Sequence, residues 1–194
     1  VWQEPGLARR YPAYLRAMHG VIRTSVPLME LAAARCAGLP AGDPVARPLR
    51  AYLLEHIEEE RGHDDWLLED LAALGEPWDP ARDVPSPAVA RLAGAPYYWV
   101  RHHHPVALLG YIAVLEANAP SPGLAGRLAA AGVPRAATRT VREPAELDTG
   151  HAEELLGLVD ALAPDPGQSR AITTGALSAA EALMALFAEL AHAR

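Results

Sequence analysis

Apolar residues recur at helical intervals along almost the whole chain. They return at steps of three and four between breaks rich in proline and glycine, and no segment shows the alternation typical of a β-strand. The pattern predicts an all-α protein, with about seven helices in one bundle forming a single domain over residues 1–194. The predicted ranges are 8–37, 44–74, 88–92, 97–118, 123–131, 143–162 and 169–193.

Proline and glycine also indicate where these helices begin, bend and end. Pro27 predicts a kink in the first helix, and Pro105 predicts a bend in the fourth. Asp43 is a natural N-cap for the second helix, with Pro44 at its first position. Gly75 then closes that helix, because glycine readily adopts the left-handed conformation found after helix ends.

The second predicted helix carries polar side chains where apolar ones are expected. Leu53, His56, Glu60, His63 and Leu67 follow one another at steps of three and four, which places them on one face of a continuous helix. That face should point to the core. Burying imidazoles and a carboxylate costs at least about 2 kcal/mol each unless a partner offsets the cost. Metal coordination is an offset that suits both side-chain types.

Two later segments also carry ionisable side chains at positions where apolar residues are expected. Glu116 is the only charged residue in the apolar segment 105–118. Asp148 and His151 are spaced i, i+3, and His151 continues a line of leucines. Three helices are therefore predicted to point oxygen or imidazole donors inward, the ligand chemistry of non-haem iron or manganese. The candidate metal ligands are Glu60, His63, Glu116, Asp148, His151 and His56.

Several of these histidines and carboxylates allow other interpretations. A single buried histidine is more often a core residue whose nitrogens are hydrogen-bonded. Glu59 competes as a ligand, because it lies i+3 from His56 and four residues before His63. His19 is either a satisfied histidine or a haem ligand. The adjacent histidines 102–104 splay around a helix and do not converge on one ion.

Composition excludes several classes of function. A net charge of −7 and a pI of about 5.6 argue against a nucleic-acid partner. Cys36 is the single cysteine, so no intramolecular disulfide forms. No run reaches the length of about 18 unbroken apolar residues expected of a membrane span, and no secretory pattern opens the sequence. We therefore expect a cytoplasmic protein without a membrane partner.

The motifs also resemble a known family. Glu60-x-x-His63, Glu116 and Asp148-x-x-His151, together with segments 19–29 and 56–68, resemble the haem-oxygenase-like di-iron oxidases and oxygenases, often labelled iron-containing redox enzymes. The resemblance implies a haem-oxygenase-like bundle in which Glu60 and His63 bind one iron, Glu116 bridges, and Asp148 and His151 bind the other.

It further implies Fe(II)/Fe(III) chemistry with O2 on a small amine, amino-acid-like or fatty-acid-like substrate in biosynthesis. A homodimer is among the assemblies it implies.

The sequence departs from this family at one expected ligand. Family members carry a histidine four residues before the aspartate, and this chain has Pro144 there, which offers no donor. His56 stands where some relatives have their first carboxylate, seven residues before His63. Because of this departure, the sequence leaves open whether the protein binds one iron ion or two. It also leaves a second function open, that of a degenerate, metal-poor member that binds a ligand or a partner protein.

Overall fold

The described chain is helical, as the sequence predicts. The structure is a computed structural model that describes residues 2, 5–76, 78–121, 123–147 and 151–192, except for the side chains of 144–147 and 151–152. Its elements are α1 (Leu7–Ile22), α2 (Ser25–Ala37), α3 (Ala46–Glu60), α4 (His63–Ala73), α5 (Pro87–His102), α6 (Ala107–Ala117), α7 (Leu124–Ala130), the short 3-10 helix η1 (Arg135–Ala137), α8 (Arg139–Leu147), α9 (His151–Leu162) and α10 (Pro166–Ala191). These described residues contain no strand.

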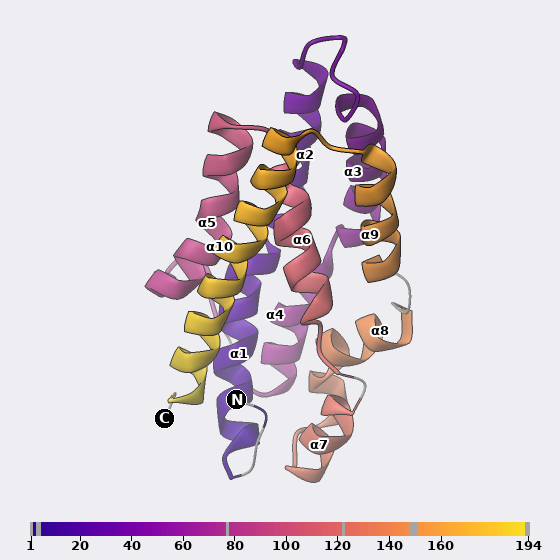
Figure 1. Cartoon of the computed structure of the whole chain (residues 1–194). Coiled ribbons are helices and arrows are strands. Elements are labelled where there is room, and N and C mark those ends of the chain that lie inside the picture. Colours follow the sequence, from indigo (N-terminus) through magenta and orange to yellow (C-terminus); the bar gives the residue numbers. More distant parts are fainter. Residues whose placement is uncertain (1, 3–4, 77, 122, 148–150, 193–194) are drawn as a thin grey trace.

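The helices form one bundle around α6 (Figure 1). Helix α6 packs against α5, α9 and α10, and all its residues from Ala107 to Ile112 are buried. Helix α1 packs against α4, α5 and α10, while α2 pairs with α3. Helices α7 and α8 lie at the end of the bundle where α1 begins and α10 ends. The arrangement leaves α3 and α6 on opposite sides of a central space.

The predicted continuous helix over 44–74 is wrong, because it breaks between α3 and α4. Arg61 is extended (φ −64°, ψ 118°) and Gly62 is left-handed (φ 87°). Glycine adopts that conformation without the steric cost that a side chain carries. Glu60 therefore ends one helix and His63 begins the next, so the two do not lie on the single straight stripe that their spacing suggests.

The first predicted helix also divides, although not at its proline. Helix α1 ends at Ile22 and α2 begins at Ser25. The Thr24 hydroxyl donates to the Val21 carbonyl oxygen at 2.7 Å and turns the chain there. Pro27 lies in the first turn of α2, where its missing N–H would have had no helical partner.

The remaining boundaries explain why the described residues form more helical segments than seven. The predicted helices 88–92 and 97–118 become α5 and α6, which are separated by residues 103–106 instead of being bent at Pro105. The predicted helix 143–162 corresponds to α8 and α9, whose junction at 148–150 lies outside the described residues. The predicted helices 123–131 and 169–193 correspond to α7 and α10.

Helix α3 begins at Ala46 with Val45 at its N-cap, two residues later than predicted, and Asp43 ties three segments together just before it. One carboxylate oxygen accepts from the backbone N–H groups of Val45 and Ala46. The other accepts from Nε2 of His104 at 3.1 Å, and Gln168 at the start of α10 donates to the same carboxylate. Although burial alone would raise it, these hydrogen bonds hold the pKa of Asp43 below its ordinary value.

Asp70 holds the start of α8 against α4. Its side chain is fully buried, and its two carboxylate oxygens accept from the backbone N–H groups of Arg139 and Thr140, both at 2.9 Å. The Tyr11 hydroxyl lies 3.5 Å from one of them. Burial raises the pKa of Asp70, while these hydrogen bonds oppose that rise.

Helices α6 and α10 cross closely at two glycines. A Cβ atom added at Gly110 would collide with the backbone of Ile172, and one added at Gly175 would collide with the carbonyl group of Ala107. The absence of side chains at Gly110 and Gly175 therefore sets the distance between the two helices. By length and apolar composition alone α10 could cross a membrane, but here it packs against α5 and α6.

We expect Gly110→Ala to lower the free energy of unfolding by about 1–3 kcal/mol, because the added methyl group forces α6 and α10 apart. Gly94→Ala is the matched control, since its added Cβ in α5 meets no heavy atom within 4 Å. That control should raise stability by up to about 1 kcal/mol through helix propensity. Urea unfolding of both variants measures the difference, and equal effects would contradict the close crossing.

We expect Asp70→Ala to cost about 2–3 kcal/mol in urea unfolding, because it leaves two buried backbone N–H groups without an acceptor. The neighbouring Glu69 forms an exposed ion pair with Arg139. Glu69→Ala should therefore cost less than about 1 kcal/mol. A loss in the Asp70 variant no larger than in the Glu69 variant would show that Asp70 does not anchor α8.

Candidate metal centre

A largely apolar cavity of about 400 Å³ lies at the centre of the bundle, bounded by residues of α1, α2, α3, α4, α6 and α10. This volume is within the range of about 300–1,000 Å³ typical of small-molecule sites. Buried side chains such as Leu28, Met29 and Leu108 form its walls. The aromatic side chains of Trp66 and Tyr111 line it too.

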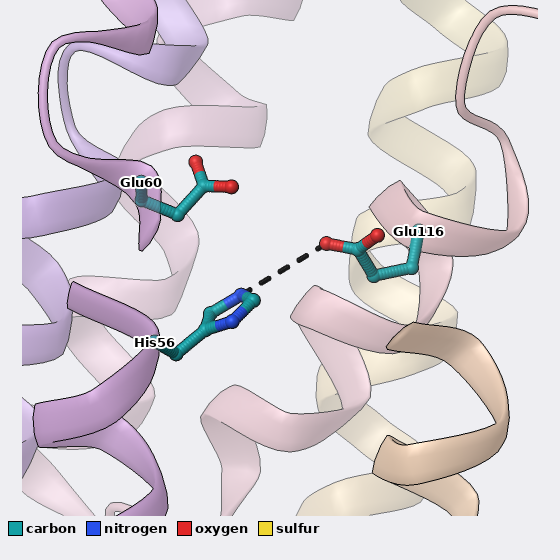
Figure 2. A group of neighbouring side chains, drawn as sticks. All are labelled: His56, Glu60 and Glu116. Carbon is teal, nitrogen blue, oxygen red and sulfur yellow. Dashed lines mark ion pairs between the residues drawn. The ribbon is translucent and has the colours of Figure 1, made fainter. Parts of the chain in front are cut away.

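Three potential metal ligands from two facing helices approach one another in this cavity. His56 and Glu60 come from α3, and Glu116 comes from the end of α6 on the opposite side (Figure 2). One ligand atom from each residue lies within 4.8 Å of the others. Nε2 of His56 is 3.9 Å from Oε1 of Glu116. Residues 56 and 60 converge because positions i and i+4 share a helix face.

The three side chains are largely buried, so bringing them together costs free energy unless an ion binds between them. The side chain of His56 is 5% exposed, and that of Glu116 is 16% exposed. The Glu60 side chain is 17% exposed. Two neighbouring carboxylates repel each other, and partial burial weakens the screening of that repulsion by water. A bound cation offsets both costs, and imidazole and carboxylate are donors that Fe(II) accepts.

The imidazole of His56 is held on two sides by its own helix. Nδ1 lies 3.0 Å from Oε2 of Glu59. The ring of Tyr52 stacks on it with centroids 5.3 Å apart and an angle of 16° between the ring planes. Tyr52 is not among the predicted site residues, although its place four residues before His56 on the same helix face signals the contact.

His63 lies beside the cluster but is not one of its members. Its Nδ1 is 3.3 Å from Oε1 of Glu60, and its ring lies against Trp66 with centroids 4.2 Å apart. It also lines the cavity. Asp148 and the side chains of Pro144 and His151 lie outside the described residues, so the second iron set implied by the resemblance stays a prediction.

His19 faces a different cavity, between α1, α5 and the segment 78–86. Its side chain is buried, and its ring meets Trp78 edge-on with centroids 5.1 Å apart. Among the described residues, Nδ1 of His19 has no hydrogen-bond partner. Burial, reinforced by the charge of Arg23, lowers the pKa of His19. His19 therefore does not belong to the cluster of His56, Glu60 and Glu116.

Comparison with known proteins identifies the family. The model of the family described as iron-containing redox enzymes matches residues 13–184. The chain belongs to this family. The bundle is similar to the crystal structure of a domain of unknown function with a haem oxygenase-like fold from Shewanella denitrificans OS217, with a TM-score of 0.70 at 18% identity. That match covers 94% of this chain and 79% of the other. No curated protein matches the sequence.

These findings confirm the family and the haem-oxygenase-like fold that the sequence motifs suggest. They also support the general class of function, that of a redox enzyme that contains iron. The assignment of individual ligands rests on the side-chain geometry described above. By that geometry, three residues of the predicted set converge, namely His56, Glu60 and Glu116.

Proposed function

We propose that this protein is a non-haem iron-dependent oxidase or oxygenase that uses O2 on a small, largely apolar substrate. The convergence of His56, Glu60 and Glu116 at the wall of an apolar cavity carries the proposal. Membership of the iron-containing redox enzymes supports it independently.

One iron fits the described donors. His56, Glu60 and Glu116 offer one imidazole and two carboxylates, which leaves coordination positions open, as in other three-ligand non-haem iron sites. These residues would hold the iron, which would supply the redox chemistry with O2 that amino-acid side chains lack. The chain's own contribution is to orient the three donors and to keep bulk water away with the apolar walls. A second iron would need His63 together with Asp148 and His151.

The cavity also restricts the substrate. The chain contains no lysine, and no arginine is found among the described residues that line the cavity. A substrate carboxylate would therefore find no lysine or arginine to pair with among those residues, and the basic side chains there are His56 and His63. Within the substrates implied by the resemblance, the proposal favours an apolar molecule whose polar group is an amine or is uncharged over a fatty-acid-like one.

Anaerobic addition of Fe(II) tests the metal site. We expect a saturable rise in melting temperature, because an ion that binds only the folded state stabilises it by about 2.7 kcal/mol at 100 times its Kd. His56→Ala, Glu60→Ala and Glu116→Ala should abolish the rise, and Glu30→Ala, an exposed variant on α2, should keep it. Iron-loaded protein should then consume O2 in the presence of a reductant.

The same titration decides between the enzyme and the metal-poor binding protein. If Fe(II) leaves the melting temperature of the wild type unchanged, the three side chains are satisfied by mutual contacts and the iron proposal fails. His63→Ala addresses the number of ions. An unchanged iron content in this variant supports a one-iron site built on His56, whereas loss of half the iron would show that His63 holds a second ion.

Calorimetric titration with dodecylamine, dodecanol and dodecanoate tests the substrate class. We expect the amine and the alcohol to bind more tightly than the carboxylate. Met18→Trp, which fills the cavity from α1, should abolish binding without changing Fe(II) uptake. Met184→Trp is the matched control, because Met184 is 65% exposed on α10. Tightest binding by dodecanoate, or binding that survives Met18→Trp, would contradict the proposed substrate class.

A further inference from the structure

We infer that Glu59 is a positioning residue for the metal centre, which fixes the tautomer and the orientation of His56 so that Nε2 faces Glu116. This inference rests on the proposed iron site and assigns a role to a residue outside the three-ligand cluster. The carboxylate of Glu59 and that of Glu116 lie near different nitrogens of the same ring, at 3.0 Å from Nδ1 and 3.9 Å from Nε2.

The contact with Glu59 decides which nitrogen carries the proton in a neutral imidazole. An ionised carboxylate only accepts hydrogen bonds, so opposite Glu59 in that form Nδ1 of His56 is the donor at 3.0 Å. The lone pair of a neutral ring then lies on Nε2. Nε2 points toward Glu116, the side on which the three potential ligand atoms gather. The ring is thus set to coordinate through Nε2.

The two carboxylates have different environments that match different roles. Glu116 is 16% exposed and belongs to the three-residue cluster, whereas Glu59 is 47% exposed and does not. A half-exposed carboxylate keeps its charge at a lower desolvation cost than a buried one. Glu59 therefore contacts the imidazole at the nitrogen that faces away from Glu116, and it lines the cavity without belonging to the three-residue cluster.

Local spacing allows the orientation to exist before any metal binds. Glu59 is three residues after His56 and Tyr52 is four residues before it, so all three share one face of α3. The Tyr52 ring restricts the imidazole by stacking, and Glu59 fixes the ring's rotation by hydrogen bonding. A ligand that is already oriented loses less conformational entropy on coordination.

The test compares Glu59→Ala and Glu59→Gln with Glu58→Ala. Glu58 is adjacent in sequence but exposed and paired with Arg61, so its variant controls for the loss of one acidic residue from α3. Fe(II) affinity is measured anaerobically for each protein. A two-bond ¹H–¹⁵N spectrum of the histidines in the metal-free protein, with His56 assigned by comparison with His56→Ala, reports the tautomer directly.

We expect Glu59→Ala to weaken Fe(II) binding by about 10–100-fold, as is usual for partners of metal-bound histidines, and to lose the Nδ1-protonated pattern of His56. Glu59→Gln should retain the pattern and most of the affinity, because its amide oxygen still accepts from Nδ1. Glu58→Ala should match the wild type in both measurements.

Three results would overturn the inference. An Nε2-protonated His56 in the wild type contradicts the tautomer, even if no metal binds. Wild-type Fe(II) affinity in Glu59→Ala contradicts the positioning role. An equal loss of affinity in the Gln and Ala variants, with the tautomer unchanged, would make Glu59 a ligand. Absence of Fe(II) uptake by the wild type defeats the proposed function instead, and the histidine spectrum still decides the tautomer.

Discussion

The desolvation of charged groups inside an apolar bundle is the constraint from which the site follows. His56, Glu60 and Glu116 are brought within a few ångströms of one another beside a cavity with largely apolar walls. Water at that position is too limited to solvate two neighbouring carboxylates as it would at the surface. A bound cation would offset that cost, and the family to which the chain belongs is described as iron-containing.

The packing of α6 determines whether the cluster can form. Helix α6 lies against α10 at Gly110, where no side chain separates the two backbones. Its other faces carry Tyr111 and Ile112 into the cavity wall, and its last turn carries Glu116 toward α3. A wider separation of α6 from α10 would shift Glu116 relative to His56. The glycine contact and the metal centre are therefore coupled through one rigid helix.

Sequence reasoning reaches the parts of this structure that periodicity and burial control. A lone carboxylate in an apolar helix identifies Glu116, and i, i+4 spacing pairs His56 with Glu60. Periodicity continues unaltered through Gly62, so it does not reveal the left-handed turn that displaces His63 from the shared face. The anchoring role of Asp70 is not predictable from the sequence for another reason. Its partners are backbone N–H groups 69 and 70 residues away, and no local pattern encodes them.

The described donors form one cluster, whereas the pair of irons implied by the family pattern also draws on residues outside the described part of the chain. His56, Glu60 and Glu116 offer one imidazole and two carboxylates, and Glu59 adds a third carboxylate beside the same imidazole. A second Fe(II) at the same wall would leave an excess of positive charge unless Asp148 or another carboxylate joined it. Pro144 removes the histidine that would help to hold that ion. Since an uncompensated charge beside apolar walls is costly whatever its sign, the number of ions that the proposed site accepts depends on how many of these carboxylates converge there.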